Sequence, residues 1–253
     1  MSAGRIVAVA LLVALLAACA SGGSEFPRSS ESAASYNVQL GYAYLQQGNL
    51  PLAKEKLERA VQQDATSPDV HSALGLLYER LGDPKRADRH FLTALRLAPK
   101  DPQIENNYAI YLCRNGRAEE GVRHFESAAR NPLYRTPATA YTNAGVCLRN
   151  DGRMADAEKN FRRALEVMPN SAEAMFQLGD LRLQQGAAAD ARTEVDRYLD
   201  AFRATPDLLL LRVRIARATG DKLAEEKFSR RLRIDFPDTD QARALAAPDR
   251  NPG

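Results

Sequence analysis

The chain has 253 residues, of which 45% are hydrophobic and 26% charged, a composition typical of soluble proteins with one sizeable structured region. Its formal net charge of +3 is close to neutral for this length and gives no indication of a nucleic-acid partner, because such proteins usually concentrate basic residues on one face. Tryptophan is absent and aromatic residues make up only 7%, whereas residues that favour helices are plentiful. The composition therefore favours a helical protein.

The N-terminus carries the pattern of an export signal. Arg5 precedes an unbroken apolar run over residues 6–18, which is too short to span a bilayer but has the length of a secretory h-region. The run ends in "LAAC", which resembles the lipobox of bacterial lipoproteins; an ordinary signal peptide with a chance cysteine is the alternative. The resemblance implies removal of residues 1–18 as a signal peptide and acylation of Cys19. Because Ala20 follows, and not Asp, it also implies sorting to the outer membrane.

Three further segments follow from composition and periodicity. Residues 19–33 are rich in Ser, Gly and Ala and have no apolar period, so we expect a flexible tether behind the lipidated cysteine. Residues 34–240 carry a periodic pattern and are predicted to form the folded domain. Residues 241–253 match no part of that pattern, and we expect a disordered tail.

Glycines recur through the periodic segment at a nearly constant interval. Successive members of the series lie 34, 34, 36, 34 and 34 residues apart: Gly48, Gly82, Gly116, Gly152, Gly186 and Gly220. Each follows helix-forming residues and precedes a short turn, as expected where a helix ends at a residue with positive φ. Seven positions before five of the six glycines stands another Gly or an Ala, small enough for two helices to cross closely.

This pattern resembles the tetratricopeptide repeat, a helix–turn–helix unit of 34 residues. The match runs from about residue 34 to 237 and is poorest in the last unit, where Arg212 and Val213 stand in place of the small pair. A generic helical bundle with accidental periodicity is the alternative. The resemblance implies an all-α fold, a right-handed superhelical solenoid of about six repeats, whose first helices line a concave groove.

No motif for catalysis or metal binding emerges from the sequence. His90 and His124 lie 34 residues apart, each directly before the core Phe of its unit, so they are equivalent positions in successive repeats and not ligands one turn apart. His71 occupies a site that often holds a bulky packing residue. No phosphate-binding glycine motif and no nucleophile elbow occurs. We therefore predict a protein that is not an enzyme and has no metal, no small-molecule substrate and no cofactor apart from the lipid at Cys19.

Two cysteines remain besides Cys19. Cys113 and Cys147 lie on the predicted first helices of adjacent units, and thiols tend to pair in the oxidising compartment that an exported protein enters. Between them, Pro132 and Pro137 bracket a connection that is two residues longer than the others. We predict a Cys113–Cys147 disulfide that joins units three and four; two free buried thiols are the alternative.

Four segments resemble the PilF/PilW family of tetratricopeptide lipoproteins. They read "GYAYLQQGNLPLAKEKLERA", "NNYAIYLCRNGR", "HFESAARNPLYRTPATAYTNAGVC" and "AEKNFRRAL". The resemblance implies a pilotin of type IV pilus biogenesis: a non-catalytic, lipid-anchored scaffold on the periplasmic side of the outer membrane. Such a protein binds the secretin subunit and promotes its outer-membrane localisation and multimerisation. Another outer-membrane tetratricopeptide lipoprotein, acting in barrel assembly or as an adaptor for cell-wall hydrolases, is the alternative.

Counting positions within each unit assigns the residues expected to face the groove. Units one and two offer mainly apolar side chains and Gln, and lack the Lys, Arg and Asn of a carboxylate clamp, so an apolar or mixed partner segment fits better. The predicted groove residues are Val38, Tyr42, Leu45, Leu76, Asn106, Ile110, Arg114 and Asn143. Seven arginines between residues 203 and 233 are explained by a solvated face, or alternatively by a site for an acidic partner or lipid headgroups.

Overall fold

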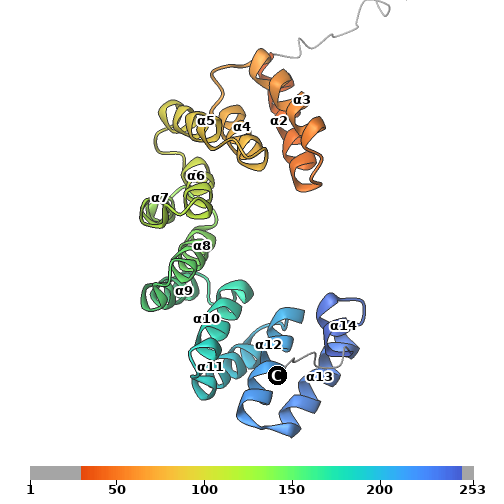
Figure 1. Ribbon diagram of the computed structural model, residues 1–253. Helices are drawn as coiled ribbons and strands as arrows, with labels where there is room; N and C mark the ends of the chain where they lie inside the picture. The colour runs from red at the N-terminus through yellow and green to blue at the C-terminus, as the bar shows by residue number, and fades with distance from the viewer. Residues whose placement is uncertain (1–29, 247–253) are drawn as a thin grey trace, which may run out of the picture.

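The computed structural model describes residues 30–246, and within this range it contains thirteen helices and no strand (Figure 1). The helices are α2 (Ser30–Gln46), α3 (Leu50–Gln63), α4 (Pro68–Arg80), α5 (Pro84–Leu97), α6 (Pro102–Arg114), α7 (Ala118–Arg130), α8 (Pro137–Asn150), α9 (Met154–Val167), α10 (Ala172–Gln184), α11 (Ala188–Ala201), α12 (Pro206–Thr219), α13 (Lys222–Asp235) and α14 (Asp240–Ala246). The predicted signal peptide, Cys19 and most of the predicted tether lie outside the described residues. The predicted all-α solenoid is confirmed.

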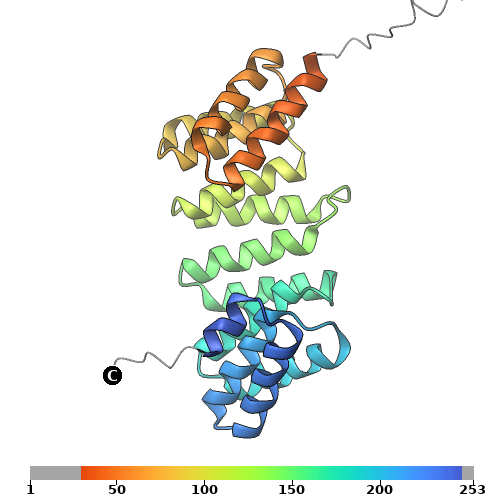
Figure 2. The same ribbon diagram turned by 90° about the vertical axis from the view of Figure 1, so that its right-hand side faces the viewer.

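The helices are paired and stacked into an arc. In Figure 1, α6, α8 and α10 lie on the inner side of the arc, and their partners α7, α9 and α11 lie on the outer side. Each first helix contacts the first helix of the next unit, from α2 through α4, α6, α8 and α10 to α12. Figure 2 looks onto the inner side and shows the units stacked like rungs. The concave surface is therefore built from first helices, as the repeat pattern implies.

Most helix starts carry a capping side chain or a proline, although α7, α9 and α11 have neither. The side chain of Ser67 accepts a hydrogen bond from the backbone N–H of Val70, and that of Asp83 accepts one from Arg86 at 2.9 Å. Proline follows both caps, where its missing N–H would have no helical partner. At these two helix starts, a side chain of the preceding turn satisfies an amide group that has no partner within the helix.

Helix ends within each unit are set by the six periodic glycines. All six have positive φ, between 70° and 80°, and among the described residues no non-glycine residue does. The residue after each glycine donates its N–H at 2.9 Å to a carbonyl oxygen five residues back, as from Asp83 to Tyr78 and from Arg117 to Leu112. This closure is the same in every unit, which explains why the interval between glycines is so regular.

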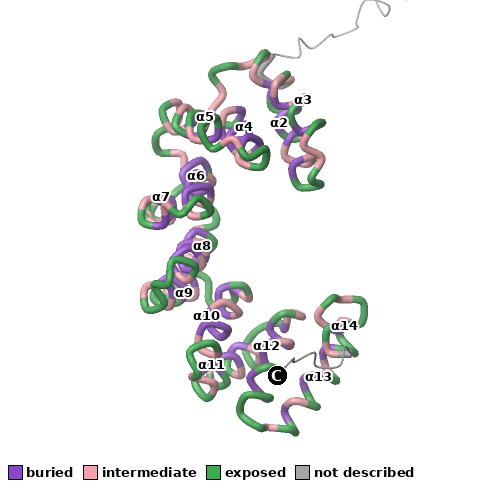
Figure 3. Tube along the Cα trace, in the orientation of Figure 1, coloured by how far each residue is buried: buried purple, intermediate pink, exposed green. Residues whose placement is uncertain are grey.

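The second small position brings the two helices of a unit into close contact. A Cβ atom added to Gly145 would lie 2.4 Å from Cε1 of Phe161, and one added to Gly41 would lie 2.4 Å from Cδ2 of Leu57. Phe91, Phe125 and Phe161 are fully buried or nearly so. Figure 3 shows burial concentrated where helices meet. In the last unit, where the small pair is absent, Arg212 is buried, paired with Asp196 and placed over the ring of Phe228.

The folded domain extends beyond both of its predicted ends. Helix α2 begins at Ser30, so the first four residues of the domain's opening helix were predicted as tether. The expected disordered tail is wrong for residues 241–246, which belong to α14. The physical reason is that Ala242 and Leu245 join the apolar cluster on α12 and α13, while Gln241 donates to Asp207 at 2.6 Å. Residues 247–253 lie outside the described part.

Filling the small position should weaken the fold. Gly145→Ala places a methyl group against the ring of Phe161, and we expect the free energy of unfolding to fall by about 1–3 kcal/mol. Urea denaturation followed by circular dichroism measures this. The double variant with Phe161→Leu should lose less than the sum of the two single variants, because the smaller side chain makes room. Additive losses would contradict a steric conflict at this crossing.

Candidate partner-binding groove

A hollow of about 700 Å³ lies where the first three units meet; we call it the N-terminal hollow. Its walls come from α2, from the connection between α3 and α4 with the start of α4, and from α6. The lining residues are Ser35, Val38, Gln39, Tyr42, Asp64, Thr66, Ser67, Pro68, Asp69, Gln103 and Asn107. Because three first helices contribute, the hollow exists only in the stacked solenoid.

Its chemistry is mixed, with an aromatic wall and an acidic rim. Tyr42 is half-buried, and burial raises the pKa of its hydroxyl. Burial and the nearby carboxylate of Asp101 raise the pKa of Asp69. The amide of Asn107 donates to Ser72 at 3.1 Å, which fixes its orientation. Such a surface suits a partner segment that combines apolar side chains with cationic or amide donors.

The predicted groove residues of the first two units fall into different environments. Val38 and Tyr42 line the N-terminal hollow, but Val38 is only 6% exposed because it packs in the core between α2 and its neighbours. Leu45 is also 6% exposed and belongs to the same core, so it is not presented to a partner. Leu76 is partly buried against this core. A groove position in the repeat count is therefore not always a surface position.

The repeat pattern does not predict the polar residues of the rim. Gln39 is an exposed position of α2 beside Tyr42, while Asp64 and Thr66 lie in the connection between units one and two. Gln103 and Asn107 reach the hollow from unit three. The available signal was the polar, Pro-containing connection "DATSPD", which breaks the helical pattern next to the groove.

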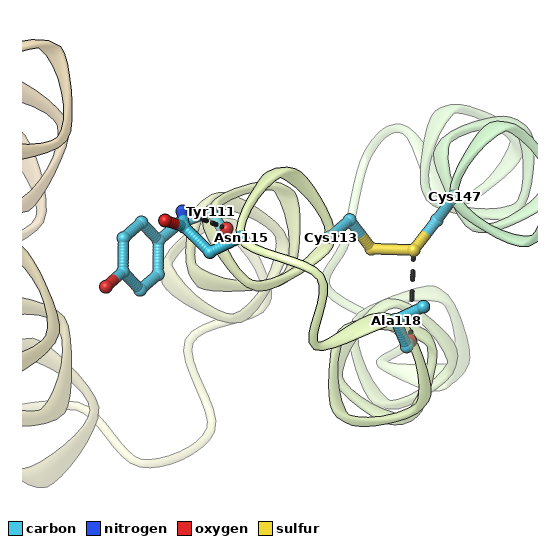
Figure 4. Close-up of a disulfide and its surroundings, with 5 residues drawn as sticks. All are labelled: Tyr111, Cys113, Asn115, Ala118 and Cys147. Carbon is cyan, nitrogen blue, oxygen red and sulfur yellow. Dashed lines mark hydrogen bonds between the residues drawn. A yellow bond between two sulfur atoms is a disulfide. The ribbon is translucent and has the colours of Figure 1, made fainter. Parts of the chain in front are cut away.

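The predicted cysteine pair is joined by a disulfide in the structure, with the Cα atoms of Cys113 and Cys147 5.6 Å apart. Figure 4 shows the bond crossing from α6 to α8, and Tyr111 projecting from the opposite side of α6. The hydroxyl of Tyr111 donates to the carbonyl of Pro84 at 3.0 Å. Cys147 Sγ also lies 3.8 Å from the Ala118 carbonyl oxygen, a packing contact, since a bonded sulfur carries no hydrogen. Helix α6 is thus held to both neighbouring units.

A smaller hollow, of about 230 Å³, lies beside the disulfide. The predicted groove residues Ile110, Arg114 and Asn143 line it. Asn106 is buried and accepts a hydrogen bond from the Asn143 amide at 3.4 Å, so it supports the wall and does not face a partner. Arg114 lies 3.6 Å from Glu79 of the preceding unit. The eight predicted residues are therefore divided between the core and two hollows.

His71 and His90 form a ring cluster with Tyr78. His71 and His90 approach with their Nδ1 atoms 3.0 Å apart, and Nε2 of His71 lies 3.0 Å from the Ala65 carbonyl oxygen. Tyr78 stacks on His90. Within residues 30–246, no group of three or more His, Cys, Asp or Glu side chains is arranged to hold a metal ion. Nor is any helix of this range long and apolar enough to cross a membrane.

The C-terminal arginines are largely engaged within the fold. Arg214 lies 2.7 Å from Asp180, which also pairs with Arg149 of unit four. Arg231 pairs with Asp235 in its own helix. Arg203, Arg230 and Arg233 are exposed, in keeping with a solvated face.

Comparison with known proteins agrees with this architecture. Models of the tetratricopeptide repeat match residues 41–82, 68–101 and 136–204. The chain is 27% identical over 237 residues to the type IV pilus assembly protein PilF of Pseudomonas aeruginosa, covering 92% of this chain and 94% of that protein. It is 31% identical over 143 residues to an uncharacterized protein of Haemophilus influenzae, covering 56% and 80%.

Solved structures give the same relationship. That of Pseudomonas aeruginosa PilF superposes with a TM-score of 0.64 at 25% identity, covering 86% of this chain and 98% of that one. The structure of PilW, described as a widely conserved type IV pilus biogenesis factor, gives 0.65 at 26% identity, covering 85% and 98%. The molecule is thus a tetratricopeptide-repeat scaffold, the class that its stacked helix pairs define. Within this class, the chain belongs to the PilF/PilW family.

Removing the disulfide should loosen the contact between units three and four. For the double variant Cys113→Ala with Cys147→Ala, we expect the free energy of unfolding to fall by about 2–4 kcal/mol, because the unfolded chain gains freedom. Urea denaturation of the oxidised protein and of the variant measures the difference. Reduced wild-type protein should unfold at the same urea concentration as the variant. Coincident unfolding curves for the oxidised wild-type protein and the variant would contradict the prediction.

Acid should weaken the ring cluster. Burial, then the charges of His71, Arg89 and Arg86, lower the pKa of His90 from 6.5 to about 4. Between these values the unfolded chain binds a proton that the folded chain does not, so the stability present above pH 6.5 falls as the pH decreases toward 4. His90→Phe keeps a ring in place and should show a shallower decline in urea midpoints. If the urea midpoints of the wild-type protein and the variant decrease equally with pH, His90 is not the cause of the acid sensitivity.

Proposed function

We propose that this protein is a pilotin of type IV pilus biogenesis. In this role it binds the outer-membrane secretin subunit, carries it to the outer membrane and promotes its multimerisation. The observation that carries the proposal is the similarity to PilF and PilW, which extends over most of this chain and nearly the whole of each relative. The N-terminal hollow supports it, because an open, mixed surface built from three first helices suits capture of a peptide segment.

In the proposed role, the protein binds the secretin subunit and holds it at the membrane, and no catalysed reaction is required. A solenoid offers a long concave surface that exists before the partner arrives, so little ordering of the scaffold opposes binding. We propose that acylated Cys19 anchors the protein on the periplasmic side of the outer membrane, a position supported by the lipobox resemblance. The links between units, including the disulfide, would then keep the groove in one shape while the lipid holds it at the membrane.

The secretin subunit should be lost from pull-downs when the N-terminal hollow is filled. Ser35→Arg with Gln39→Arg adds two long cationic side chains to exposed positions on one face of α2, outside the core. We expect the wild-type protein to capture the subunit from detergent-solubilised membranes and the double variant to lose about tenfold in affinity or more.

Controls separate binding from folding. Gln46→Arg with Gln62→Arg places the same charges at exposed positions that do not line the hollow, and it should bind as wild type does. Circular dichroism should give equal helicity for all three proteins. In cells, deletion of the gene should reduce secretin multimers and twitching motility. Normal multimers in the deletion strain would rule out the pilotin role.

A further inference from the structure

The longer connection between units three and four is held in a defined shape. The side-chain oxygen of Asn131 accepts a hydrogen bond of 2.9 Å from the N–H of Leu133. Its backbone carbonyl oxygen accepts one of 3.0 Å from the N–H of Tyr134. Its side-chain amide donates at 2.9 Å to the carbonyl oxygen of Lys100, in the preceding connection between units. Tyr134 is buried in the core between α6, α7 and α8. Two connections are thereby tied together at one edge of the solenoid.

This arrangement presents an apolar side chain to solvent beside an open hollow. Leu133 is 83% exposed, the largest exposed fraction among the large hydrophobic residues of the described part. It borders a hollow of about 660 Å³, formed by residues 98–103 and 133–136; we call it the edge hollow. Pro99, Pro102 and Tyr134 are among its lining residues. The Leu133 side chain is removed from water only when a ligand covers it, and this burial would favour binding.

The charges around the edge hollow are cationic. Lys100 and Arg135 line it and are exposed, and neither side chain forms an ion pair with another described residue. Asp101 also lines the hollow, but its carboxylate caps α6, accepting the N–H groups of Gln103 at 2.8 Å and Ile104 at 3.1 Å. Two cationic groups are therefore available to a ligand, beside a carboxylate that is already hydrogen-bonded.

The edge hollow adjoins the N-terminal hollow at Gln103, which lines both. The N-terminal hollow has an acidic rim at Asp64 and Asp69, and the edge hollow is cationic at Lys100 and Arg135. An extended strand lying across Gln103 would thus meet opposite charges at its two ends.

We propose that the edge hollow is the second half of the secretin-binding surface and takes an extended segment with an apolar side chain next to Asp or Glu. This inference rests on the proposed function. The apolar side chain covers Leu133, and the acidic group lies between Lys100 and Arg135. The polarity of the surface fixes the direction of the segment, with its cationic or amide end in the N-terminal hollow.

Binding of the purified secretin subunit to the full-length protein tests the proposal. Leu133→Ser and the charge reversal Lys100→Glu with Arg135→Glu should each weaken binding by about tenfold. The charge reversal should also flatten the dependence of affinity on salt, because it removes the cationic contacts. Leu223→Ser, at a position 80% exposed on α13, and Lys85→Glu with Arg89→Glu on α5 are the matched controls and should bind as wild type does.

An array of overlapping secretin peptides identifies the segment independently of any variant's stability. The peptides bound by the wild-type protein should carry Asp or Glu beside Leu, Ile or Phe, and exchanging these acidic residues for Lys should restore binding to the charge-reversal variant. Wild-type affinity in both edge variants, together with loss in Ser35→Arg with Gln39→Arg, would overturn this inference and leave the pilotin function intact. No binding of the subunit by wild-type protein would overturn both.

Discussion

The close crossing of the two helices in each unit is the contact on which the rest of the structure depends. Gly145 against Phe161 and Gly41 against Leu57 leave no room for a methyl group. The large partner then reaches the interface with the next unit, where a single unit could not bury it alone. Stability therefore accumulates by stacking, and the arc with its concave surface follows from the angle that this contact imposes.

The register break between units three and four interrupts this stacking logic and is compensated locally. Contacts between α7 and α8 persist across the longer connection. The disulfide adds a covalent link between the first helices α6 and α8, next to Gly121, where an added Cβ would lie 2.5 Å from Cys113 Sγ. Extra length in the connection and extra constraint on the helices thus occur together. The connection itself buries Tyr134 in the core between these units and still presents Leu133 to solvent.

The repeat architecture was predictable because its constraints are local and periodic. The positive φ at Gly82 recurs in all six units and the small residue at Gly75 in five of them, and Cys147 occupies a position that is apolar elsewhere. The candidate binding surface was not predictable in the same way. Counting placed Val38 and Leu45 on the groove, but at the end of the stack they complete the core. Two of the rim residues, Asp64 and Thr66, come from a connection, which carries no periodic signal.

The charges of the two hollows give the proposed partner segment a preferred direction. An apolar groove alone accepts many segments in either direction, because the hydrophobic effect is non-directional. Placing Asp69 at one end and Arg135 at the other makes the reversed segment bring like charges together. The resulting penalty discriminates between orientations more than it adds affinity, since exposed charges contribute little net binding free energy. In the proposed complex, affinity depends on the apolar contacts at Tyr42 and Leu133, and selectivity depends on the charges of the rim.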